Sequence, residues 1–242
     1  MIWEYLLNSA VLVSCGKRKI LVDGIFSDHQ NFDIMDKDLQ EKLMDRKPPF
    51  DGLNLLLFTH CHSDHYSKSK TIRFLERNPQ TMLFLPPNGG ISRRLAGFLG
   101  AKLVVTEGEE GRLLTYEVDD LLIEYMKVDH LTFDYPEHYC INIVCGEENI
   151  TFTADMDFNK MDMIKGFTRK NCSTIFINHL DMLHRKWRNS LLELGYGKIC
   201  FYHLPSSCAD GFGYRDRALR NWSRYQSMFP NGQLLMYEPK EK

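Results

Sequence analysis

Several features are scarce or missing in this 242-residue sequence. Basic and acidic residues nearly balance, with 30 Lys and Arg against 32 Asp and Glu, so the net charge is about −2 with neutral histidines. A chain without a basic excess has no general attraction for nucleic acid or for an anionic membrane surface. No apolar run approaches the roughly 18 residues that are needed to cross a bilayer. We therefore expect neither a long nucleic acid nor a membrane among the partners.

Cysteine spacing carries no pattern either. The seven cysteines are scattered, odd in number and without a C-x-x-C pair. The first 15 residues include Glu4, Asn8 and Ser9 and no basic stretch before an apolar one, which is not the pattern of a signal peptide. We therefore expect a cytoplasmic protein whose cysteines are mostly buried free thiols.

The composition that is present is that of an ordinary globular chain, 43% hydrophobic and 26% charged. Apolar runs predict strands at 3–7, 10–15, 19–23, 53–58, 82–85, 102–105, 112–116, 121–128, 139–144, 150–153, 174–177, 198–203 and 233–237. Helical patterns fall at 38–44, 69–77, 91–99, 159–165, 184–194 and 214–228. Strand hairpins open the chain and recur in its middle, so we predict one α/β domain over 1–242 with two mixed sheets rather than a doubly wound sheet.

One stretch concentrates polar donors. The buried-strand pattern from Leu53 to Phe58 ends at Thr59-His60-Cys61-His62-Ser63-Asp64-His65, which places three histidines and an aspartate within six residues. A loop after a strand is where a rigid sheet can position such side chains. Imidazole and carboxylate together are ligands for zinc and related divalent metals. The stretch therefore predicts a site for one or two metal ions.

Other predicted strands also end in Asp or His. Asp23, His130, Asp155 and His203 each follow or close a separate strand. With the four donors of the first stretch they suffice for two metal ions, between which a carboxylate can bridge. Water held by such a pair becomes hydroxide near neutral pH, which indicates hydrolysis of an ester, lactone, amide or phosphodiester.

These motifs resemble the metallo-β-lactamase superfamily. The run from Thr59 to His65 fits its H-x-H-x-D-H signature, and Val22-Asp23-Gly24, His130, Thr153-Ala154-Asp155 and Tyr202-His203-Leu204-Pro205 follow the order of the remaining motifs. The resemblance covers the chain to about residue 205 and is closest to the lactonase-like and phospholipase-D-like branch. It implies a four-layer αββα sandwich.

The resemblance also implies roles. His60, His62 and His130 would bind a first metal, Asp64, His65 and His203 a second, and Asp155 would bridge them. Asp23 would orient ligands through hydrogen bonds, and Asp64 or a histidine of the cleft would move the proton to the leaving group. Zinc is the expected metal, while Mn²⁺, Fe²⁺ and Ni²⁺ accept the same ligands.

Two positions depart from the family pattern. Ala154 stands where glycine usually precedes the fourth-motif aspartate, and His138 opens the strand where glycine usually follows the third motif. We choose His130 over His138 as the ligand and leave open whether His138, His179 or His184 joins the site.

The sequence thus predicts a hydrolase that uses a metal-bridged hydroxide on a small molecule, as a lactonase or phosphodiesterase. The alternatives are a metal-binding or sensing protein without turnover, and a diiron redox protein. Diiron relatives typically have Glu where this chain has His62, and they carry a flavin domain. A homo-oligomer is compatible with the sequence, which specifies no interface.

Overall fold

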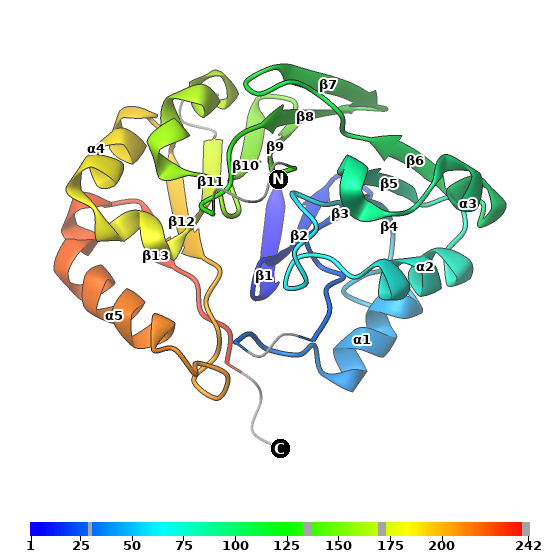
Figure 1. Cartoon of the computed structure of the whole chain (residues 1–242), viewed down its shortest axis with the longest axis horizontal. Helices are drawn as coiled ribbons and strands as arrows, with labels where there is room; N and C mark the ends of the chain where they lie inside the picture. Colours follow the sequence, from blue (N-terminus) through cyan, green and yellow to red (C-terminus); the bar gives the residue numbers. More distant parts are fainter. Residues whose placement is uncertain (29–30, 133–136, 169–172, 239–242) are drawn as a thin grey trace. The chain divides into compact units, whose positions relative to one another are not determined.

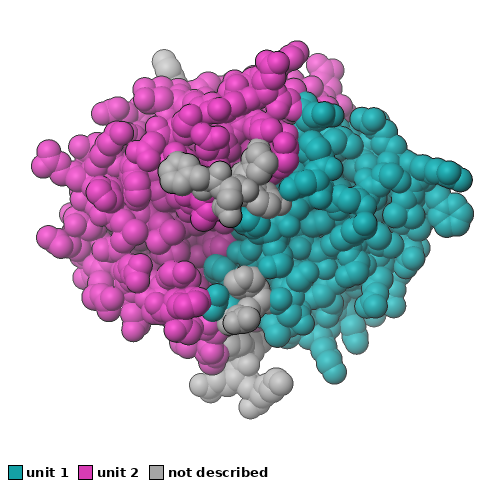
Figure 2. All heavy atoms as spheres, viewed as in Figure 1, with its two compact units in different colours: residues 1–107 teal, residues 108–242 magenta. Residues whose placement is uncertain are grey.

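The computed structural model describes residues 1–28, 31–132, 137–168 and 173–238. The chain divides into two compact units, residues 1–107 and residues 108–242, which Figure 2 colours separately. Each unit has its own sheet, as Figure 1 shows, so the predicted α/β class with two mixed sheets is confirmed. The grouping of both units into one domain stays a prediction.

The sheet of unit 1 combines a hairpin edge with a parallel half. Its six strands, counted among the described residues, are ordered β1-β2-β3-β4-β5-β6. They are β1 (Ile2–Leu7), β2 (Ala10–Cys15), β3 (Arg18–Val22), β4 (Leu53–Leu57), β5 (Met82–Leu85) and β6 (Lys102–Val105). The first three pair antiparallel and β3 to β6 pair parallel. The parallel strands have the almost continuous apolar sequence of strands buried on both faces.

Helices connect the parallel strands of unit 1. They are α1 (Lys37–Met44), α2 (Lys68–Arg77), the short 3₁₀ helix η1 (Pro87–Gly89) and α3 (Arg93–Phe98). Successive parallel strands joined by crossovers of one hand place their helices on one face of the sheet, as Figure 1 shows for α2 and α3. Helix α3 begins at Arg93, two residues after the predicted start, because the Ser92 hydroxyl accepts a hydrogen bond from the Leu95 amide at 3.1 Å and caps the helix.

The sheet of unit 2 has the same plan as that of unit 1, with antiparallel strands first and parallel strands last. Among the described residues it has seven strands in the order β13-β12-β11-β10-β9-β8-β7. They are β7 (Leu113–Val118), β8 (Leu121–Lys127), β9 (Tyr139–Cys145), β10 (Glu148–Phe152), β11 (Ser173–Asn178), β12 (Lys198–Tyr202) and β13 (Gly232–Leu234). Pairing is antiparallel from β7 to β10 and parallel from β10 to β13.

The helical segments of unit 2 differ from the prediction at three places. They are η2 (Phe158–Phe167), η3 (His179–Leu183), α4 (Arg185–Glu193), α5 (Tyr214–Tyr225) and η4 (Gln226–Met228). The predicted helix 159–165 is a 3₁₀ segment, the predicted helix 214–228 ends as a regular α-helix at Tyr225, and η3 has no apolar periodicity that would reveal it. Figure 1 shows α4 and α5 along one side of β11 to β13.

The core of unit 2 lies between its sheet and these helices. Ile175 and Ile177 of β11 lie in this core together with Leu191 of α4. On the opposite face of the sheet, Phe152 of β10 and Phe176 of β11 stack with ring centroids 4.9 Å apart, and both are fully buried. Burial of a phenylalanine side chain is worth about 1.5–3 kcal/mol relative to its exposure. This packing fixes the register of adjacent strands and therefore the positions of the residues that follow them.

The expectation that the cysteines are free thiols is wrong for two of them. Mostly buried free thiols were expected, but Cys15 and Cys145 are disulfide-bonded. Among the described residues Cys61, Cys140, Cys200 and Cys208 are free, and of these Cys140 and Cys200 are buried, while Cys172 lies outside the described residues. Within the described part of the chain, no helix combines the length and apolar character needed to span a membrane.

Candidate functional site

The predicted donors of unit 1 lie at the carboxyl ends of two neighbouring parallel strands. Asp23 directly follows β3, and the loop with His60, His62, Asp64 and His65 follows β4. Because β3 and β4 run parallel, their carboxyl ends meet at one edge of the sheet. All five side chains are buried except that of His62, which is partly exposed.

Asp23 is the centre of a hydrogen-bond network. Its Oδ1 accepts the Thr59 amide at 2.8 Å, and its Oδ2 accepts the Thr59 hydroxyl at 2.6 Å. The same Oδ2 lies 2.9 Å from Nδ1 of His65. A carboxylate can only accept there, so the His65 proton stays on Nδ1 and the lone pair on Nε2 is left for a metal.

Thr59 extends this effect to His60. The Thr59 hydroxyl proton is directed to Asp23, so the oxygen that lies 3.1 Å from Nδ1 of His60 acts as the acceptor. The His60 proton therefore sits on Nδ1, and Nε2 carries the lone pair. That Nε2 lies 3.2 Å from Nδ1 of His62. Two nitrogens at about 2.0–2.1 Å from one tetrahedral zinc stand roughly 3.3 Å apart, so these two atoms have the spacing of co-ligands.

Asp64 and His65 form the second donor pair of unit 1. Nε2 of His65 lies 3.8 Å from Oδ2 of Asp64, a separation that suits two ligands at a wide angle on one ion. The Ser9 hydroxyl donates to the Asp64 carbonyl oxygen at 3.3 Å and anchors the loop to the opening hairpin. The donors of unit 1 thus fit divalent metal binding in residue type, spacing and ring tautomer.

The donors of unit 2 come from separate strand ends. Asp155 follows β10 and His203 follows β12, while His130 follows the antiparallel strand β8. The two oxygens of Asp155 face different rings: Oδ2 is 3.6 Å from Nε2 of His130, and Oδ1 is 3.9 Å from Nε2 of His203. A carboxylate with one oxygen toward each of two ligands is the arrangement that a bridge between two ions requires.

His130 differs from His60 and His65 of unit 1 in which ring nitrogen carries the proton. The Thr132 amide donates to Nδ1 of His130 at 3.0 Å, which places the proton of the neutral ring on Nε2. A ring that binds a metal through Nε2 carries its proton on the other nitrogen. His130 therefore has the right position and the opposite tautomer. In buried His138, Nδ1 lies 3.0 Å from the Val128 carbonyl oxygen, which holds that proton on Nδ1.

Two further histidines have contrasting environments. Burial and the nearby His203 lower the pKa of His179 to about 3 against the opposing attraction of Asp155, so its ring is neutral. His184 is exposed and packs on Trp187 with ring centroids 4.7 Å apart. Of these two histidines, only His179 lies beside predicted donors of unit 2, as His138 does with ring centroids 5.5 Å from His130.

Two polar residues were not predicted from the sequence, namely Asn178 at the end of β11 and Asp181 in η3. Asn178 donates from Nδ2 to Oδ1 of Asp155 at 2.6 Å. Burial raises the pKa of Asp181 to about 8, although Arg188 opposes the shift. A polar residue at the end of an apolar strand was the available signal for Asn178, since the same signal identified Asp155 and His203.

The backbone is strained where the motifs lie. Asp23, Ala154 and His203 have φ values of +47°, +43° and +67°, in the left-handed region that disfavours residues with a side chain. Such strain concentrates at functional sites. The positive φ at Ala154 also explains why glycine is usual at that position of the family motif.

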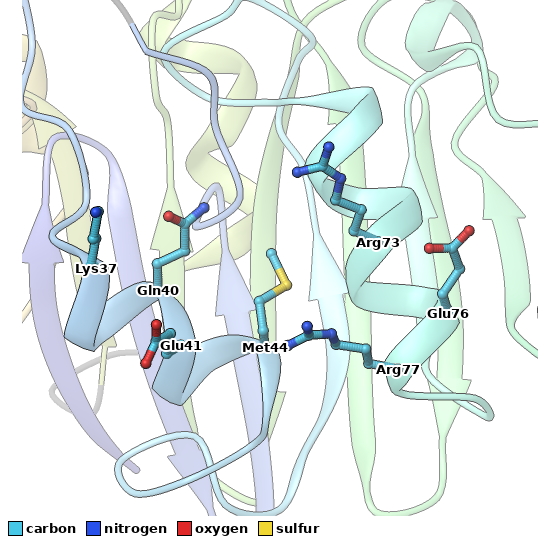
Figure 3. Close-up of a pocket in the computed structure, with 7 residues that line it drawn as sticks. All are labelled: Lys37, Gln40, Glu41, Met44, Arg73, Glu76 and Arg77. Atoms are coloured by element: carbon cyan, nitrogen blue, oxygen red, sulfur yellow. The ribbon is translucent and has the colours of Figure 1, made fainter.

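A cavity of about 480 Å³ lies elsewhere in unit 1, between α1 and α2. Figure 3 shows Arg73 and Arg77 of α2 extending toward Lys37, Gln40 and Met44 of α1. Arg77 is paired with Asp45 at 3.1 Å. Glu41 and Glu76 also contribute to the lining, so the charges are mixed, and no donor of unit 1 is among these described lining residues.

Comparison with solved structures identifies the fold. Igni18, a metallo hydrolase from Ignicoccus hospitalis, matches with a TM-score of 0.64 and 14% identity over 99% of this chain and 95% of its own. The chain has the metallo-β-lactamase fold. The metallo-β-lactamase fold protein YhfI from Bacillus subtilis matches with a TM-score of 0.61 and 15% identity over 96% of this chain and 88% of its own.

A diiron enzyme is also among the matching structures. CmlA, a diiron β-hydroxylase from Streptomyces venezuelae, matches with a TM-score of 0.63 and 14% identity over 97% of this chain and 52% of its own. No protein-family model and no curated protein sequence matches the chain. At these identities the likeness concerns the fold alone.

Proposed function

We propose that the protein is a metal-dependent hydrolase of the metallo-β-lactamase fold. The observation that carries the proposal is the donor geometry in each unit. In unit 1, His60 and His62 have the spacing of co-ligands, with the His60 tautomer set for binding. In unit 2, the carboxylate of Asp155 faces two histidines. Burying this many polar donors is costly unless something uses them.

The ligand roles follow from the family resemblance. His60, His62 and His130 are assigned to one ion, Asp64, His65 and His203 to the other, and Asp155 to both. Two ions bound there would supply a hydroxide at neutral pH and polarise the bond to be cleaved. Zinc is our first choice, and iron fits the same imidazole and carboxylate donors.

The residues of the chain then have distinct tasks. Asp23 holds His65 directly and His60 through Thr59, so it orients two ligands without binding a metal itself. Asp64 is a ligand with a carboxylate that can also accept a proton and deliver it to the leaving group. His130 must exchange the proton position that Thr132 favours when it binds.

The proposed substrate is a small molecule with an ester, lactone or phosphodiester bond. The near-zero net charge argues against a long nucleic acid. Purified protein loaded with Zn²⁺, Mn²⁺ or Fe²⁺ would be assayed with p-nitrophenyl esters, lactones and bis-p-nitrophenyl phosphate. Turnover of the phosphodiester alone would exclude the lactonase version.

His62→Ala is the decisive variant for this assay, and His184→Ala is its matched control. Removing one ligand should lower kcat/KM at least 100-fold, because ligand loss displaces the ion and the groups that it orders. The exposed His184 should be replaced without loss. Equal activity of the two variants on every substrate would refute the proposed function.

The likeness to CmlA supports a second candidate, a diiron redox protein. A diiron centre absorbs visible light, whereas a dizinc centre is colourless. Metal analysis and the visible spectrum of the protein as isolated therefore separate the two. Tight metal binding without turnover on any substrate would favour the sensing alternative instead.

A further inference from the structure

Asn178 occupies a central position among the strand ends of unit 2. Strand β11, which it closes, lies between β10 and β12, the strands that precede Asp155 and His203. Its partner in the register of β12 is Tyr202, the residue before His203. The side chain is only 3% exposed. Asn178 is thus placed to contact the donors on either side.

The contact that it makes is with Asp155. Nδ2 of Asn178 donates to Oδ1 of Asp155 at 2.6 Å. A hydrogen bond to an ionised acceptor is shorter and stronger than one between neutral groups, and burial strengthens it further. Oδ1 keeps a second lone pair, directed elsewhere, for a metal.

A second hydrogen bond fixes which end of the amide faces Asp155. Oδ1 of Asn178 accepts the Leu180 amide at 3.0 Å and caps η3. A backbone N–H can only donate, so the amide oxygen must face Leu180 and the NH₂ group must face Asp155. Asn178 is therefore an obligatory donor to the carboxylate.

The hydrogen bond from Asn178 restricts rotation of the Asp155 carboxylate. Its Oδ1 lies 3.9 Å from His203 Nε2 and its Oδ2 lies 3.6 Å from His130 Nε2. Turning the carboxylate away from this arrangement would break the bond to Asn178. The backbone is held as well, because the Asp155 carbonyl oxygen accepts the Leu131 amide at 2.8 Å.

We propose that Asn178 is a positioning residue that holds Asp155 with one oxygen toward each histidine and thereby sets the metal affinity of unit 2. This role rests on the proposed function, since it acts through a metal ligand. Because the hydrogen bonds of its side chain are with Asp155 and the Leu180 amide, loss of Asn178 should change metal occupancy before it changes any catalytic step. Loss of such a supporting contact typically weakens metal binding 10- to 100-fold.

Two substitutions test the role. Asn178→Asp keeps the shape and the acceptor for the Leu180 amide but places a carboxylate oxygen against Asp155, and Asn178→Ala removes the donor without adding charge. Asn159→Asp is the matched control, because exposed Asn159 donates from Nδ2 to Asp157 at 3.0 Å in the same unit. Metal-free protein would be titrated with Co²⁺, following the visible absorption bands, bound cobalt per chain and the metal-free melting temperature.

We expect the wild type and Asn159→Asp to bind two Co²⁺ per chain with the same spectrum. Asn178→Ala should bind the more weakly held ion at least 10-fold less tightly, and Asn178→Asp should lose it. Variants with wild-type cobalt affinity and spectrum, even with a lower metal-free melting temperature, would show a purely structural role and overturn the inference alone. A wild type that binds no cobalt would overturn this inference and the proposed function together.

Discussion

The two units supply their donors in opposite ways. Unit 1 carries four donors within six residues of one loop, and Asp23 fixes the ring protons of His60 and His65 in the form that a metal requires. Unit 2 takes its three donors from three separate positions along the chain, with Asp155 facing both histidines. There Thr132 holds His130 in the opposite tautomer. For the proposed metal binding, the loop of unit 1 is preorganised, whereas unit 2 depends on strand register and on a shift of the His130 proton to Nδ1.

The largest loss of metal affinity in unit 1 is expected from Asp23→Asn, which removes the carboxylate that fixes the ring protons of His60 and His65. An amide nitrogen in place of Oδ2 would donate to Nδ1 of His65, which moves the ring proton to Nε2 and blocks binding. We expect metal affinity to fall 10- to 100-fold, measured by competition with a chromophoric chelator.

Asp51→Asn is the control for this change. Asp51 pairs with Lys19 at 2.7 Å on the surface of unit 1, so its substitution changes the charge equally and touches no donor. If both variants bound metal as the wild type does, the claim that Asp23 preorganises unit 1 would be wrong.

Asp181→Asn tests how the buried carboxyl of η3, the segment that follows Asn178 in unit 2, changes stability with pH. The native pKa of about 8 lies above the ordinary value of 3.8, so the native state holds a proton that the unfolded state releases. This contribution to stability is full below pH 3.8 and is lost as the pH rises to about 8. The asparagine variant should therefore match the wild type near pH 4 and exceed it near pH 8 by roughly 1–3 kcal/mol.

Urea unfolding at both pH values measures this difference. Asp162→Asn is the control, because Asp162 is exposed and paired only with Lys165 at 2.6 Å among the described contacts. A variant advantage that is the same at pH 4 and pH 8 would contradict the raised pKa.

The smallest effect is expected from Ala154→Gly. Relief of the left-handed strain, worth about 1–2 kcal/mol, should outweigh the loss of one buried methyl group at about 0.8 kcal/mol. We expect a gain of about 0.5 kcal/mol in thermal or urea unfolding. Ala218→Gly in α5, where φ is helical, should instead destabilise the protein, and a loss at both positions would remove strain as the explanation for the family's glycine.

The contrast between the units also explains which strands and which donors could be predicted from the sequence. Apolar runs such as Leu53–Leu57 predict strands well because burial on both faces demands them. The donor cluster of unit 1 is visible because it is contiguous. The donors of unit 2 are visible in the sequence only as single Asp or His residues at separate strand ends. The family resemblance supplied their grouping, since their proximity depends on the order of strands in the sheet.

Other features depend on contacts that no local pattern encodes. The tautomer of His130 is set by the Thr132 amide, and the role of Asn178 by the end of the neighbouring strand. The segment η3 begins at the capping side chain of Asn178 and has no apolar repeat that would reveal it. The helical pattern at 159–165 located η2 but did not show that it is a 3₁₀ segment capped by Asp157. The oxidised state of Cys15 and Cys145 has no spacing signal.

The proposed function requires that the assigned ligands bind two divalent ions per chain. Metal per chain, measured by elemental analysis after loading metal-free protein with Zn²⁺ and removing the excess, tests it most directly. We predict two equivalents in the wild type and about one or fewer in His62→Ala. Less than one equivalent in the wild type, with no change in His62→Ala, would contradict the account.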